Sequence, residues 1–219
     1  MCLSPEASFI AAGVLAPAGV ATLRLVRRRD ELILAALPLL FAGHQAVEGI
    51  VWLGLEGQLS DRLLELAIRA YLVFAQVVLP VLVPVGLLWF EQDAGRRRWL
   101  IALVVLGLAV GARLLCVISA HPVGARVLEH SIVYDTDVHF GYVVAAGYVA
   151  ATCGPPLLSS SSLLWRFGVA NLAGLTLAAL IKYSAVTSVW CFYAALVSAL
   201  IAVALRRRPA QTPVASASS

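Results

Sequence analysis

The chain has 219 residues, of which 61% are hydrophobic and only 13% are charged, and its mean hydropathy is +0.92. A soluble domain carries about a quarter charged residues, so this composition excludes an ordinary water-facing surface. The formal charge of +4 comes mainly from arginines that flank apolar runs, a pattern that does not indicate nucleic-acid binding.

Seven apolar runs follow one another along the chain, and each is long enough to cross about 30 Å of hydrocarbon as a helix. Prolines at Pro38, Pro80 and Pro84 predict kinks, because neighbouring helices can shelter the carbonyls that proline leaves without a donor. The sequence therefore predicts an all-α polytopic membrane bundle in one domain, residues 1–208, and a disordered tail, residues 209–219. The seven expected spans are 7–26, 32–55, 63–90, 99–119, 138–157, 163–183 and 187–205.

Three arginine triplets predict the orientation of the bundle. They occupy 27–29, 96–98 and 206–208, after the first, third and seventh spans. With seven spans they share one side, which the positive-inside rule makes cytoplasmic. We therefore expect the amino terminus outside the membrane and the carboxyl terminus in the cytoplasm.

The second span carries the densest set of polar residues. His44 and Glu48 are four residues apart, so they share a helical face, and Trp52 extends that face by one turn. Gln45 lies beside them. Because polar groups in hydrocarbon cost free energy, such a group predicts a functional site.

Other spans add further polar candidates, of which Arg69, Arg113 and Lys182 are expected at the depth of Glu48. Arg69 and Gln76 lie on the third span, Arg113 on the fourth, and Asn171 with Lys182 on the sixth. An ion pair of Glu48 with Arg69 or Arg113 that only locks helices together is the simplest alternative. The loop 120–137 adds a second group of ionisable residues that we expect near this level: His121, Glu129, His130, Asp135 and Asp137.

A positioned carboxyl in an apolar cavity is a proton donor, and a histidine one turn away can orient or reload it. In this interpretation Glu48 is the initiating acid, His44 assists it, and Asp137 is a second acid or base. Trp52 and Tyr142 are expected to face inward and steady a cation, while Gln45, Arg69, Gln76, Arg113 and Asn171 bind the substrate. No metal and no other cofactor are expected. The four cysteines lack metal-ligand spacing, and a disulfide between Cys116 and Cys191 stays open.

Three stretches resemble a largely uncharacterised family of small bacterial membrane proteins whose members begin Met-Cys-Phe-Ser-Ala. These stretches are residues 1–9, 43–52 and 189–192, although the opening here reads Met-Cys-Leu-Ser-Pro. The resemblance implies a multi-pass protein of the bacterial inner membrane. The size, the helix content and the acid on the second span also resemble the membrane-bound terpene cyclases of meroterpenoid and indole-sesquiterpenoid pathways. That second resemblance implies metal-independent cyclisation of a prenylated, lipid-like substrate, but the late second acid of that family has no match after Asp137.

Other functions stay open. A metal-dependent lipid hydrolase of the seven-helix ceramidase type would want histidines late in the chain, and none follows His139. A retinal protein would want its lysine in the middle of the last helix, whereas Lys182 ends the sixth span. A non-enzymatic transporter, channel or assembly subunit is the strongest rival, although the absence of internal repeats argues against a transporter. A Mg²⁺ site at Asp135 and Asp137, which would hold a diphosphate, is only weakly indicated by two acids in a loop. Membrane lipids are the expected surroundings, and the oligomeric state is not determined by the sequence.

Overall fold

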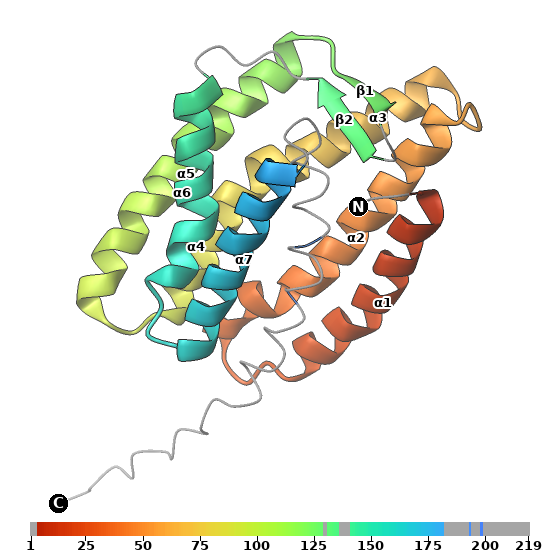
Figure 1. Ribbon diagram of the computed structural model, residues 1–219. Helices are drawn as coiled ribbons and strands as arrows, with labels where there is room; N and C mark the ends of the chain where they lie inside the picture. Colours follow the sequence, from red (N-terminus) through yellow and green to blue (C-terminus); the bar gives the residue numbers. More distant parts are fainter. Residues whose placement is uncertain (1–3, 129–130, 136–140, 182–192, 194–197, 199–219) are drawn as a thin grey trace, which may run out of the picture.

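The computed structural model describes residues 4–128, 131–135 and 141–181, together with Tyr193 and Ser198. The described chain is a bundle of long helices with one small hairpin at one end (Figure 1). The helical bounds in chain order are α1 Pro5–Arg24, η1 Arg29–Glu31, α2 Leu32–Leu55, α3 Asp61–Leu72, η2 Val73–Val78, α4 Leu79–Phe90, α5 Ala94–Ala120, α6 Gly141–Leu157 and α7 Ser162–Ile181.

Helices α1 and α2 form an antiparallel pair. Ser4 begins α1, where its hydroxyl accepts a hydrogen bond from the Ala7 N–H. The two backbones approach closely at Gly19, where a Cβ would lie 2.5 Å from the Leu39 nitrogen. A residue larger than glycine would therefore push the two helices apart.

One continuous helical stretch, Asp61–Phe90, consists of α3, η2 and α4. Its middle part, η2, is a π-helix in which the Leu79 N–H bonds to the Phe74 carbonyl, five residues back. The prolines Pro80 and Pro84 follow directly and do not end the helix. The kink predicted at these prolines thus takes the form of a π-turn next to a proline-containing helix.

A β-hairpin closes one end of the bundle, which we call the hairpin end. Strands β1, Gly124–Leu128, and β2, Ser131–Asp135, pair antiparallel, with Gly124 opposite Asp135. The purely helical prediction was wrong here, because the segment was expected to be a loop. Ile132 of β2 is buried against Val51 of α2 and Tyr71 of α3, so apolar packing on these helices holds the hairpin.

Within the described part of the chain, five helical stretches are long and apolar enough to cross a membrane, judged by length and composition. They are 5–24, 29–55, 61–90, 94–120 and 162–180, and they correspond to five of the seven expected spans. Helix α6 has 17 residues and matches the fifth expected span from Gly141 onward. The expected span 187–205 and the tail 209–219 lie outside the described residues.

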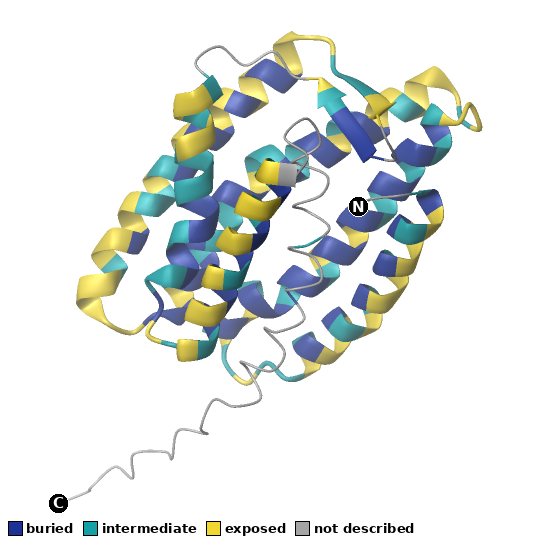
Figure 2. Ribbon diagram, in the orientation of Figure 1, coloured by how far each residue is buried: buried dark blue, intermediate teal, exposed yellow. Residues whose placement is uncertain are grey.

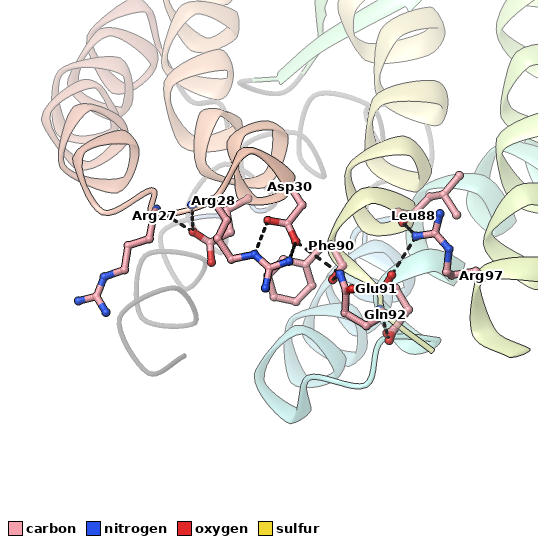
Figure 3. Close-up of polar contacts among 9 residues, drawn as sticks. Arg27, Arg28, Asp30, Leu88, Phe90, Glu91, Gln92 and Arg97 are labelled. Atoms are coloured by element: carbon pink, nitrogen blue, oxygen red, sulfur yellow. Dashed lines mark hydrogen bonds and ion pairs between the residues drawn. The ribbon is translucent and has the colours of Figure 1, made fainter. Parts of the chain in front are cut away.

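The opposite end of the bundle, which we call the arginine end, holds the connections α1–α2, α4–α5 and α6–α7 together. The Gln92 amide donates to Asp30 (Figure 3), and the Ser160 N–H donates to Glu91 at 2.7 Å. The triplets 27–29 and 96–98 therefore lie at the same end, as predicted. The triplet 206–208 lies outside the described residues. Buried residues line the inner faces of the helices, while exposed ones face outward (Figure 2).

Candidate functional site

Helix α2 places four polar side chains in the interior. Gln45 and Glu48 are 0% exposed, His44 is 3% exposed, and Trp52 is also buried. His44 lies 12 residues from the start of this 24-residue helix, about 18 Å along its axis at 1.5 Å per residue, and Glu48 lies about 6 Å further on. The residues expected from the sequence thus lie near the middle of the helix and away from the surface.

Aromatic rings from two other helical segments and the hairpin surround His44. Its ring stacks on Tyr71 of α3 with centroids 4.2 Å apart, and Phe74 of η2 lies 4.7 Å away. Tyr134 of β2 stacks on the other side of Tyr71 at 4.4 Å. Phe41, one turn before His44 on α2, meets Phe74 edge to face. We call His44, Gln45, Glu48, Trp52, Tyr71, Phe74, Gln76 and Tyr134 the central cluster.

Tyr71 and Phe74 were not predicted as site residues. The only sequence signal for them is their position in a helix whose other face carries Glu65 and Arg69, which marks them as inward-facing. Their stacking on His44 depends on how α3 packs against α2, which the local sequence does not determine.

Several buried polar atoms of this region have no hydrogen-bond partner within the described part of the chain. They include both ring nitrogens of His44, both amide atoms of Gln45, the Trp52 indole nitrogen, Gln76 Oε1 and the hydroxyl of Ser8 on α1. Leaving a buried polar group unsatisfied costs about 1–3 kcal/mol. Native interiors hold few such groups, so their concentration around one helix marks a place where polar partners are expected to bind.

The π-turn lies directly beside this cluster. In the π-helical register the Ala75 carbonyl would accept from residue 80, but Pro80 has no N–H. The Tyr148 hydroxyl of α6 donates to that carbonyl instead, at 2.5 Å. The prediction that a neighbouring helix shelters a proline-freed carbonyl is confirmed. π-Turns occur often at functional sites, and this one carries both Phe74 and Gln76.

The two arginines expected near Glu48 lie elsewhere. Arg69 forms an ion pair with Glu65, one turn back on α3, at 2.9 Å, and it also donates to the Ile118 carbonyl. Arg113 is exposed on α5. The alternative in which Glu48 pairs with Arg69 or Arg113 is not found among the described residues, where Glu65, four residues away, pairs with Arg69.

The remaining candidates are scattered. Tyr142 is 87% exposed at the start of α6, so the inward position expected for it was wrong. Asn171 is buried between α7 and α6, where its amide lies 3.8 Å from the Cys153 sulfur. Asp137, Glu129, His130, Lys182 and Cys191 lie outside the described residues.

The loop acids and histidines do not join the central cluster where the structure describes them. Asp135 is exposed and pairs across the hairpin with Arg126, and His121 is exposed too. No group of three metal-ligating side chains occurs among the described residues. The side chains of the central cluster can take part in proton transfer and hydrogen bonding beside aromatic faces.

The family model for a family of unknown function, DUF6629, matches residues 1–216. The match covers almost the whole chain, so the chain belongs to that family. No curated protein and no solved structure matches it.

Proposed function

We propose that this DUF6629 protein is a membrane-embedded enzyme that protonates a prenylated, lipid-like substrate and guides its cyclisation. The observation that carries the proposal is the group of unsatisfied polar atoms of His44 and Gln45, buried beside Glu48 and against aromatic rings. A folded chain keeps such a costly arrangement where it performs a function.

The reaction is a proton-initiated rearrangement. The Glu48 carboxyl transfers its proton to an alkene carbon or an epoxide oxygen of the prenyl chain and becomes a carboxylate. The carbocation that results is attacked by a further double bond of the same chain, which closes a ring. Loss of a proton from a carbon next to the final cation returns one proton to the protein, so the product is an isomer of the substrate.

The neighbouring side chains have defined tasks in this scheme. His44, one turn before Glu48, carries the proton between turnovers. The faces of Tyr71, Phe74 and Trp52 stabilise the cation, because an aromatic ring attracts positive charge to its face. Burial excludes the water that would quench the cation.

The same proposal includes a topology. Seven spans, the last over 187–205, place the amino terminus outside and the arginine end in the cytoplasm of a bacterial inner membrane. The two arginine triplets at one end of the described bundle support it. Reporter fusions after residue 92 and after residue 219 are expected to be cytoplasmic, and one after residue 58 to be external.

The test compares wild-type protein with Glu48→Gln in a host supplied with farnesyl-bearing indoles and quinones. Glutamine keeps the size and hydrogen bonding of the side chain but has no transferable proton. We expect a product of unchanged mass and new retention time with wild type and not with Glu48→Gln. Glu56→Gln is the matched control, since Glu56 is exposed just after the same helix, and it should keep full activity.

A non-enzymatic role in assembly is the second candidate. Arg113 favours it, because this arginine is exposed on an apolar helix, seven residues or about 10 Å before the end of α5. Such a residue fits a contact with a partner chain. Absence of any isomer from wild-type protein, with the protein present in the membrane, would favour this second role over the enzyme.

A further inference from the structure

Three carboxylates at the arginine end, Asp30, Glu31 and Glu91, are engaged in hydrogen bonds, while Asp93 is exposed and caps α5 by accepting the Arg96 N–H. Glu31 is buried and accepts hydrogen bonds from the Arg27 and Arg28 backbone N–H groups at 2.9 and 3.3 Å. Asp30 binds the Arg28 guanidinium through two bonds, of 3.0 and 2.7 Å (Figure 3). Glu91 is 1% exposed and accepts three backbone N–H groups. These three engaged acids therefore contribute little negative charge to the outer surface.

Two of the arginines at this end serve the bundle itself. Arg97 donates to the Leu88 and Glu91 carbonyls at the end of α4, and Arg96 donates to the Leu158 carbonyl just after α6. These carbonyls belong to the last turns of helices and lack donors of their own. The roles of Arg96 and Arg97 are thereby explained.

Four further arginines have no such role. Arg27, Arg29, Arg98 and Arg166 are exposed, and they form no ion pair among the residues that the structure describes. Figure 3 shows the Arg27 guanidinium extending away from the contacts that its own backbone makes. Arg98 lies near the amino terminus of α5, where the helix dipole disfavours a cation. Its charge there calls for an anionic partner outside the chain.

Exposed tryptophans accompany these arginines. Trp99 at the start of α5 is 68% exposed, and Trp165 at the start of α7 is 48% exposed. Beyond Trp99 the outward face of α5 continues as exposed Ile101, Val105 and Leu108. This order of residues, from arginine through tryptophan to an apolar helix face, matches the order of environments from the lipid headgroups to the hydrocarbon.

We propose that this surface binds the headgroups of anionic phospholipids. The surface, which we call the arginine rim, consists of Arg27, Arg29, Arg98, Arg166, Trp99 and Trp165. Its guanidinium groups pair with headgroup phosphates, and the indoles lie at the boundary with the acyl chains. The apolar face that continues from the rim selects a lipid surface over a dissolved anion. The inference does not depend on the proposed enzyme.

The test is competition between brominated lipids. The full chain is reconstituted in phosphatidylcholine vesicles, part of the lipid is replaced by chain-brominated phosphatidylglycerol or phosphatidylcholine, and quenching of tryptophan fluorescence gives the relative binding constant. We expect wild type to prefer the anionic lipid at low salt, by up to about fivefold for each contributing arginine. In 0.5 M salt, a concentration of about three times the physiological value, the preference should fall because the charges are screened.

The variants decide whether the rim is responsible. The variant Arg27→Gln/Arg29→Gln/Arg98→Gln should lose most of the preference, and single Arg98→Gln should lose a measurable part. The control Arg62→Gln/Arg113→Gln removes two exposed arginines outside the rim and should keep it. Circular dichroism establishes that each variant remains helical. No preference in wild type, full preference in both rim variants, or equal loss in the control would overturn the proposal.

Discussion

The arginine end and the central cluster are both rich in buried polar side chains, but the hydrogen bonding of these side chains differs between the two regions. At the arginine end, Glu91 receives N–H groups from Gln92, Asp93 and Ser160 at 3.0, 3.1 and 2.7 Å. In the central cluster, the polar atoms of His44 and Gln45 receive no hydrogen bond from described residues.

The contrast separates two kinds of buried polarity. A carboxylate with three backbone donors holds two connections of the chain together, α4–α5 and α6–α7, so its role is structural. An amide and an imidazole without hydrogen-bond partners among the described residues cost stability, so they are candidates for a functional role. Substitutions in the two regions are therefore expected to change stability with opposite signs.

Glu91→Ala should have the largest effect on stability. It removes the acceptor of three N–H groups, so that the α4–α5 and α6–α7 connections are held together less firmly. We expect a loss of about 3 kcal/mol in the free energy of unfolding, measured by thermal or denaturant unfolding in detergent. The exposed Glu56→Ala should stay within about 0.5 kcal/mol of wild type. A loss as small as that of the control would show that the network is not structural.

The same carboxylate predicts a pH dependence. Burial acts to raise the pKa of Glu91, but hydrogen bonds from Ser160, Asp93 and Gln92 outweigh it, so the pKa lies below its ordinary value of 4.5. A group whose pKa is lower in the folded state stabilises the fold above the unfolded pKa and loses that contribution as pH falls through the folded value. Stability should thus decline below about pH 4.5, and Glu91→Gln should show a shallower decline between pH 5 and pH 3, ranges set by the ordinary carboxyl pKa. Parallel curves for the two proteins would contradict the assignment.

The sequence predicted the helices and the polar positions of α2 because both follow from local patterns. Apolar runs indicate spans wherever they are long enough, and a histidine and an acid four residues apart share a face in any helix. Burial of His44, Gln45 and Glu48 followed from those two facts. The pair Glu65–Arg69, also four residues apart, was visible in the same way and would have excluded Arg69 as the partner of Glu48.

The features that were missed depend on packing between elements. The strands 124–128 and 131–135 do not alternate between exposed and buried residues, and β2 is buried where Ile132 packs with residues of α2 and α3. The π-turn depends on Pro80 together with a hydroxyl from α6, 68 residues later in the chain. The capping of α4 by Arg97 was not predicted, because the arginine triplet after the third span was interpreted only as a signal of membrane orientation.

Gln45→Met should change stability in the opposite direction. Methionine keeps the length of the side chain and removes two unsatisfied polar atoms from a residue that is 0% exposed. We expect a gain of about 1–2 kcal/mol in unfolding free energy, together with reduced turnover if the proposed function is correct. Gln58→Met, at an exposed position whose amide bonds only the exposed Glu56, should leave stability unchanged. A clear loss of stability in Gln45→Met would show that Gln45 is satisfied in the membrane and would remove the contrast between the two regions.

Tyr148→Phe should give the smallest change in stability among these substitutions. It tests whether the π-turn beside the central cluster is satisfied by hydrogen bonds, as the arginine end is. The Tyr148 hydroxyl satisfies the Ala75 carbonyl beside the central cluster, so its removal should cost about 1 kcal/mol. Pro80→Ala restores a backbone N–H five residues after Ala75. In that background the Tyr148 hydroxyl should contribute less to stability. A double-mutant cycle should therefore show a coupling of about 0.5–1 kcal/mol between the two positions. Strict additivity of the two stability changes would mean that the Ala75 carbonyl has another hydrogen-bond donor. The π-turn, like the arginine end, would then be satisfied without Tyr148.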